Sequence, residues 1–171
     1  MALERLSAAW REGYVSGAFA GEHDRDDSTC VFCLLATEPV SESTGVLYRS
    51  EHAFLVLNAF PYGSGHLLVV PYRHVADLGD LSDEEYLDYM GVLRRAVAAL
   101  TSAYQPDGMN VGMNLGSAGG AGIPRHLHAH ALPRWNGDTN FMTTIGEARV
   151  LSESLDATWR KVHERLGAGT Y

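Results

Sequence analysis

The sequence has few cysteines, little positive charge and no long apolar run, and each shortage narrows what the protein can be. No stretch of about 18 apolar residues occurs, so we expect no transmembrane helix. Charges at Glu4, Arg11 and Glu12 interrupt the N-terminal stretch, which therefore does not resemble a secretory signal. The expected location is the cytoplasm.

Positive charge is scarce, because 13 Lys and Arg stand against 21 Asp and Glu, giving a formal net charge of −8. A long nucleic acid is not an expected partner, since binding one relies on a broad basic surface. A small anion needs only a local cluster of donors, such as histidines and backbone amides. The composition therefore leaves a small anionic ligand open.

The only cysteines, Cys30 and Cys33, form a Cys-x-x-Cys motif. In a reducing cytosol we do not expect a structural disulfide, which leaves metal binding, redox chemistry or packing. A thioredoxin-like redox pair usually lies at a helix start beside a βαβ unit, and no such unit is apparent in the sequence. A zinc site would need two further ligands.

The order of the expected elements favours an α+β fold. Strands are expected within 45–57 (two short strands), 66–71, 108–114 and 126–134, and helices over 2–19, 82–103 and 146–167. A polar connector covers 20–29, and turn-rich loops cover 58–65 and 115–122. Because the strands come mainly as neighbours, with helices grouped between and after them, we expect an antiparallel sheet with helices packed on it.

The helix over 82–103 has the clearest signals. Ser82 and Glu85 form a capping box at its start. Large apolar residues then recur at steps of three and four and predict one buried face: Tyr86, Met90, Leu93, Val97 and Leu100.

Three histidines alternate along the strand expected over 126–134. His126, His128 and His130 should share one face, while Leu127, Ala129 and Ala131 pack on the core from the other. Neighbouring histidines would lie roughly 6.5–7 Å apart and the outer two about 13 Å apart. One phosphate should therefore not contact all three rings, which favours different roles along the strand.

Three interpretations of these histidines compete. They could chelate a metal together, they could perform nucleophilic or acid–base catalysis on a phosphate, or they could be incidental. A glycine loop, residues 115–122, directly precedes them and would let the backbone approach a ligand closely. Strict alternation after such a loop favours a functional site with a phosphate cradle.

The pattern His126-Leu-His128-Ala-His130-Ala-Leu132 resembles the signature of the histidine triad (HIT) family. The block 57–74 and the combination of Asn114 with the glycine loop resemble two further blocks of that family. The resemblance implies a sheet of about five strands with a long helix packed on it, plus N- and C-terminal helices. It also implies a homodimer and a single domain over 1–171, divided into an N-terminal helix and connector (1–29), a core (30–135) and a C-terminal extension (136–171).

The family resemblance also implies a mechanism. His128 would attack the α-phosphate of a nucleotide to form a nucleotidyl-histidine, which water or another acceptor then resolves. His130 would contact the phosphate and share the positive charge, and Asn58 would hold the ribose hydroxyls. The implied substrate-binding set is Asn58, His66, Asn114, Gly116, Ser117, Gly119, Gly120, His130 and Trp135.

The segment 133–141 resembles the bacterial diadenosine tetraphosphate phosphorylase branch, which uses inorganic phosphate to split dinucleoside polyphosphates. Many family hydrolases carry Gln or Ser just before the triad, where this chain has Gly122-Ile-Pro-Arg125. Ser117, Arg125 or Arg134 would then have to assist the leaving group. Alternatives are a hydrolase of aminoacyl or phosphoramidate nucleotides, a metal hydrolase using all three histidines, and a non-catalytic nucleotide-binding module.

Some bacterial HIT proteins carry a zinc site that includes a Cys-x-x-Cys motif. The resemblance implies that Cys30, Cys33, His74 and His126 bind a zinc ion here. Two cysteines and two histidines leave no open coordination position, so this zinc would be structural. No organic cofactor is expected.

Overall fold

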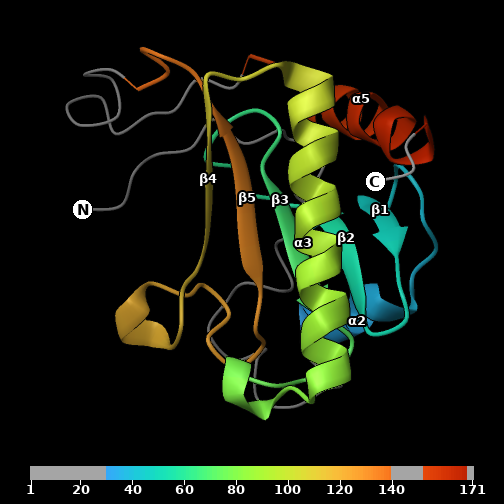
Figure 1. Cartoon of the computed structure of the whole chain (residues 1–171), viewed down its shortest axis with the longest axis vertical. Coiled ribbons are helices and arrows are strands. Elements are labelled where there is room, and N and C mark those ends of the chain that lie inside the picture. Colours follow the sequence, from blue (N-terminus) through green and yellow to red (C-terminus); the bar gives the residue numbers. More distant parts are fainter. Residues whose placement is uncertain (1–29, 140–151, 169–171) are drawn as a thin grey trace.

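The computed structural model describes residues 30–139 and 152–168. Its centre is a five-stranded antiparallel sheet in the order β1-β2-β3-β5-β4 (Figure 1). The strands are β1 (Val46–Arg49), β2 (Ala53–Leu57), β3 (Leu67–Pro71), β4 (Gly108–Met113) and β5 (Ala129–Arg134). The expected α+β fold with about five antiparallel strands is therefore confirmed.

Three helices surround the sheet in the described ranges: α2 (Val31–Thr37), α3 (Asp83–Tyr104) and α5 (Leu155–Ala168). The described connections also contain two short 3₁₀ turns, η2 (Leu78–Asp80) and η3 (Ser117–Gly119). The helix expected over 2–19, the connector 20–29 and the part of the C-terminal helix expected over 146–151 lie outside the described residues. No described helix is long and apolar enough to cross a membrane.

The long helix α3 crosses one face of the sheet (Figure 1) and begins with the expected capping box between Ser82 and Glu85. Its expected buried face is wrong in part, because Tyr86 is 44% exposed and Met90 and Val97 are only partly buried. The buried residues are Tyr89, Val92, Leu93, Ala96, Ala99 and Leu100. Counting only large side chains overlooks the alanines, whose small size lets the helix approach the sheet closely.

The two faces of the sheet belong to two different apolar clusters. Leu55, Val69 and Ala129 pack under α3, whereas Val56, Leu68 and Val70 pack with α2 on the opposite face. Both β2 and β3 are consequently buried along their whole length.

The histidine segment is only partly a paired strand. Ladder pairing in β5 begins at Ala129, three residues later than expected. The alternation nevertheless holds, because Leu127, Ala129 and Ala131 lie in the cluster under α3. The backbone N–H of Leu127 donates to the carbonyl of Val75 at 2.6 Å, which fixes the segment where the ladder has not yet begun.

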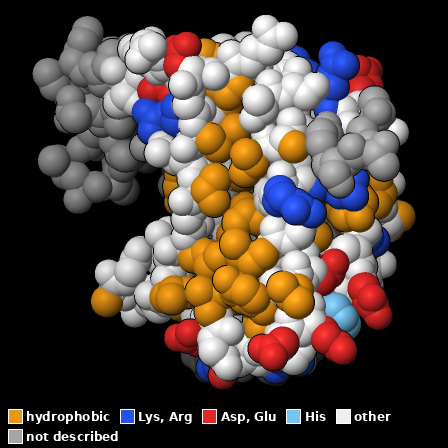
Figure 2. Space-filling view, viewed as in Figure 1, with side chains coloured by type: hydrophobic (Ala, Val, Ile, Leu, Met, Phe, Trp, Pro, Cys, Tyr) orange, Lys and Arg blue, Asp and Glu red, His pale blue; other side chains and the backbone are white. Residues whose placement is uncertain are grey.

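The two edges of the sheet differ. Beside β1, α5 presents Trp159, whose indole N–H donates to the carbonyl of Val46 at 3.0 Å. At the other edge, β4 is exposed over most of its length, and Val111 is 49% exposed. Figure 2 shows hydrophobic side chains gathered in a band over this side of the molecule, next to α3.

Candidate active site

A cavity of about 350 Å³ lies on the α2 side of the sheet. Val56, Leu68 and His130 are paired across neighbouring strands and line it together. The cavity therefore has an apolar region over β2 and β3 and a histidine region at β5. Such a combination suits a ligand with one flat apolar part and one polar part.

His128 lines this cavity and is 6% exposed. Its Nδ1 lies 2.8 Å from the backbone carbonyl oxygen of His126. A carbonyl can only accept, so Nδ1 carries the proton and the lone pair of the neutral ring is on Nε2. This tautomer makes Nε2 the nucleophilic atom.

His130 is oriented by a chain of hydrogen bonds that begins at the backbone. The N–H of Tyr62 donates to Nδ1 of His66 at 3.0 Å, so the proton of His66 is on Nε2. That Nε2–H donates to Nδ1 of His130 at 2.9 Å. The proton of His130 is therefore on Nε2, a buried atom with no hydrogen-bond partner among the described residues. His130 thus offers the cavity an N–H donor.

The turn before His66 depends on glycine. Gly65 has φ +77°, and a Cβ at this position would lie 2.8 Å from Cγ of Pro133. Only glycine fits there without strain. His66 itself is 1% exposed and lies behind His130, so it does not line the cavity as the sequence analysis expects.

The expected charge on His130 needs correction. Burial, with a smaller contribution from neighbouring His128, lowers the pKa of His130 from 6.5 to about 4. At neutral pH the ring is uncharged. His130 can therefore donate a hydrogen bond to an anion, but it does not share a positive charge as expected from the sequence.

Beside the cavity, ligand atoms of Cys30, Cys33, His74 and His126 all lie within 4.8 Å of one another. Nδ1 of His74 is 3.2 Å from Sγ of Cys33, and Nδ1 of His126 is 3.3 Å from Sγ of Cys30. Ligands around a tetrahedral zinc ion stand about 3.3–3.8 Å apart, given bonds of about 2.3 Å to sulfur and 2.0 Å to nitrogen. The four side chains therefore fit a metal ion of this kind.

His126 carries a further feature of a metal ligand. Its Nε2 lies 2.9 Å from the carbonyl oxygen of Pro71, so Nε2 holds the proton and the lone pair on Nδ1 faces the sulfurs. In metal-binding histidines, the ring nitrogen that does not bind the metal commonly donates a hydrogen bond that orients the ring. His128 and His130 are not members of the cluster, so the described geometry does not support a metal held by all three triad histidines.

The other expected site residues divide into two groups. Asn58 and Asn114 line the cavity. Gly116, Ser117, Gly119 and Gly120 belong to a connection around η3 that projects beyond the end of β4 (Figure 1), and the cavity wall does not include them.

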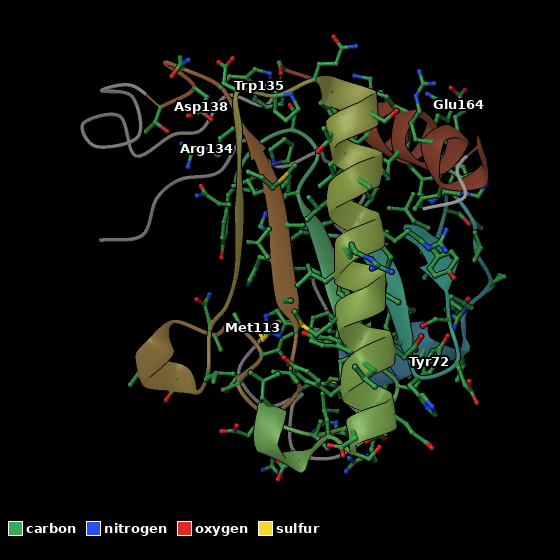
Figure 3. All side chains as sticks on the ribbon, viewed as in Figure 1. Tyr72, Met113, Arg134, Trp135, Asp138 and Glu164 are labelled. Carbon is green, nitrogen blue, oxygen red and sulfur yellow. The ribbon has the colours of Figure 1, made fainter. Side chains whose placement is uncertain are left out.

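Arg134 is the last residue of β5, and Trp135 and Asp138 follow it at the same end of the sheet, whereas Met113 lies toward the other end (Figure 3). Arg134 donates to both carboxylate oxygens of Asp138 at 2.6 Å, and the ring of Trp135 lies against Tyr104. The structure therefore does not bring these two residues to the cavity.

One wall of the cavity is formed by residues that the sequence did not predict. Val31, Phe32 and Leu35 of α2 line it, as does Tyr62, whose ring is stacked 5.9 Å from that of His130. A signal was present, since Val31 and Phe32 are the two residues between the cysteines. Only the fold shows that they face the cavity.

A family model described as "HIT domain" matches residues 40–137, more than half of the chain. The chain belongs to the HIT family. It is 36% identical to AP-4-A phosphorylase from Mycobacterium tuberculosis over 159 residues, covering 92% of this chain and 82% of that protein. This similarity confirms the expected HIT-family enzyme and its resemblance to the phosphorylase branch.

Two further similarities extend the comparison. The chain is 35% identical to bis(5'-adenosyl)-triphosphatase from Saccharomyces cerevisiae over 91 residues, which covers 53% of this chain and 44% of that protein. The fold matches the crystal structure of a Zn-bound histidine triad family protein from Mycobacterium smegmatis. That match has a TM-score of 0.67 and 26% identity, and it covers 84% of this chain and 96% of the other.

Proposed function

We propose that this protein cleaves dinucleoside polyphosphates through a nucleotidyl-histidine intermediate on His128. The observation that carries the proposal is the hydrogen bond from Nδ1 of His128 to the carbonyl of His126, which leaves the nucleophilic lone pair on Nε2 in a cavity wall. The names of the relatives from M. tuberculosis and S. cerevisiae support this substrate class.

In the first step, Nε2 of His128 forms a bond to the α-phosphorus, and the bond from phosphorus to the bridging oxygen of the leaving nucleotide breaks. The ring becomes positively charged, and its Nδ1–H continues to donate to the carbonyl of His126. The Nε2–H of His130 donates to a phosphoryl oxygen as negative charge develops. The nucleobase occupies the apolar region over Val56 and Leu68, and Asn58 contacts the ribose.

In the second step, an acceptor oxygen attacks the same phosphorus and the bond to His128 breaks. Inorganic phosphate as acceptor yields a nucleoside diphosphate, and water yields a monophosphate. The similarity to AP-4-A phosphorylase favours phosphate. Incubation with diadenosine tetraphosphate tests this: ADP plus ATP appearing only with phosphate supports a phosphorylase, and AMP plus ATP without phosphate indicates a hydrolase. No cleavage would overturn the proposal.

The Cys30, Cys33, His74 and His126 cluster could hold a metal ion, and its two sulfur and two nitrogen ligand atoms favour zinc. A bound zinc ion would neutralise the thiolates and stabilise the segment that leads into β5, leaving the phosphate chemistry to His128 and His130. The Zn-bound relative from M. smegmatis supports this assignment. Reduced cysteines of this kind are consistent with the proposed location in the cytoplasm.

The proposed quaternary state is a homodimer formed through β4. Strand β4 is exposed over most of its length and carries Val111, whereas α5 packs beside β1 at the other edge of the sheet. An open strand edge with apolar side chains favours pairing with another chain. A second copy would extend the sheet symmetrically across β4.

A further inference from the structure

Helix α2 connects the metal cluster to the cavity through neighbouring residues. Cys30 and Cys33 contribute their sulfurs to the cluster, whereas Val31 and Phe32 between them line the cavity. The ring of Phe32 has its centroid 5.4 Å from that of His126 and 5.1 Å from that of His128. One side chain therefore contacts both a member of the metal cluster and the proposed nucleophile.

The C-terminal end of α2 is held independently of the metal cluster. The guanidinium of Arg49 donates to the carbonyls of Leu35 at 2.9 Å and Ala36 at 2.7 Å, and also to that of Glu38. The same group lies over the rings of Phe54 and Tyr72. The carbonyl of Leu35 also accepts from the backbone N–H of Glu38 at 3.1 Å, so the last turn of α2 is held by both side-chain and backbone hydrogen bonds.

The N-terminal end of α2 is held differently. Cys30 is the N-cap residue and makes no side-chain capping bond, and the first turn has no acidic residue. A helix of seven residues is too short to be stable by itself and depends on tertiary anchors. Among the described residues, the first turn, which carries Val31 and Phe32, has two anchors: the apolar packing of Phe32 against the sheet and the metal cluster. Metal binding would therefore order this part of the cavity wall further.

We propose that metal binding at Cys30, Cys33, His74 and His126 and nucleotide binding in the cavity strengthen each other, with Phe32 as the coupling residue. This inference rests on the proposed function, since it needs a nucleotide in the cavity. Nucleotide binding costs conformational entropy if it has to order the first turn of α2. A metal that has already fixed this turn removes that entropy loss, so the nucleotide binds more tightly. Coupling of this kind is reciprocal, so the nucleotide must raise metal affinity by the same factor.

Calorimetric titration with adenosine 5'-monophosphate (AMP) tests the coupling. We expect zinc-loaded protein to bind AMP about fivefold or more tightly than metal-depleted protein. Chelator competition should show zinc affinity raised by the same factor at saturating AMP. Equal AMP affinity with and without zinc would overturn the coupling alone, whereas no AMP binding to the zinc-loaded protein would overturn the proposed function as well.

Two variants on the same helix separate a local coupling from a general effect on folding. Phe32→Ala and Leu35→Ala both remove part of the cavity wall and should both weaken AMP binding. Only Phe32→Ala should bring the coupling factor close to one, because Leu35 lies at the end held by Arg49. If Phe32→Ala fails to fold, Phe32→Leu replaces it. Coupling that persists equally in both variants would overturn the role of Phe32.

Discussion

His126 and His130 are placed symmetrically about His128 in the sequence, but their rings have opposite polarity. The backbone carbonyl of Pro71 accepts from Nε2–H of His126, so the lone pair on Nδ1 of His126 faces the sulfurs of Cys30 and Cys33. The Nε2–H of His66 donates to Nδ1 of His130, so the N–H of His130 is on Nε2 and is available to the cavity. Two identical side chains thus acquire different chemistry because one is held by an acceptor and the other by a donor.

The largest expected effect comes from removing the residue between them. His128→Ala should lower turnover of diadenosine tetraphosphate by about 10³-fold or more, because the nucleophile is lost. Zinc content, measured by elemental analysis, should stay unchanged, since His128 is not in the metal cluster. Unchanged turnover would contradict the role of His128, and loss of zinc would favour a metal held by the whole triad.

The second-largest effect is expected at His66, whose Nε2–H donates to His130. His66→Ala removes the hydrogen bond that sets the tautomer of His130. Turnover should fall roughly tenfold to a hundredfold, which is less than the largest losses seen when a catalytic acid or base is removed. Steady-state kinetics should show the loss in kcat more than in KM. In a His66→Ala/His130→Ala double variant the two effects should not add, because both act through His130. Additive losses would mean that His66 acts separately.

Removal of the metal from the cluster that contains His126 should lower the thermal stability of the protein. A chelator should lower Tm by about 5 °C or more, since each kcal/mol lost shifts Tm by about 2–4 °C for a chain of this size. Differential scanning calorimetry measures this, and Cys33→Ser should lose most of the response. His130→Ala is the matched control and should keep it. A Tm that does not respond to chelator would contradict a structural metal.

The protonation of His130 should appear in the pH dependence of stability. Its folded-state pKa of about 4 lies below the ordinary 6.5, so the unfolded chain binds more protons between these values. The contribution to stability is complete above about pH 6.5 and is lost as the pH falls toward 4. Urea unfolding should show a shallower decline over this window in His130→Asn. An identical slope in both proteins would contradict a neutral, buried His130.

The smallest expected effect concerns the open edge of the sheet and leaves both histidine environments intact. Val111→Glu should shift the protein from dimer to monomer in sedimentation experiments, because it places a charge on the exposed strand β4. Val40→Glu, a change at 40% exposure outside this edge, should leave the dimer unchanged. A dimer that survives Val111→Glu would mean that another surface is used.

Local patterns in the sequence predicted the parts of the site that depend on local geometry. Alternation placed the three histidines on one face, and the capping signal located the start of α3. The cluster of Cys30, Cys33, His74 and His126 could be predicted only through the family resemblance, because its members come from distant parts of the chain.

What the sequence could not predict depends on contacts between distant segments. The wall formed by Val31 and Phe32 exists only because α2 packs against the sheet face opposite α3. The neutrality of His130 follows from burial, and its tautomer from a backbone N–H in the loop before β3. Neither property has a sequence signal of its own.

The most direct test of the account is to trap the intermediate. Protein mixed with diadenosine tetraphosphate in the absence of phosphate is quenched in base, where a phosphorus–histidine bond survives, and then digested and analysed by mass spectrometry. The account predicts one adenylyl group on His128, absent from His128→Ala and reduced in amount by added phosphate. An adenylyl group on another residue, or turnover with no adduct in rapid-quench samples, would contradict it.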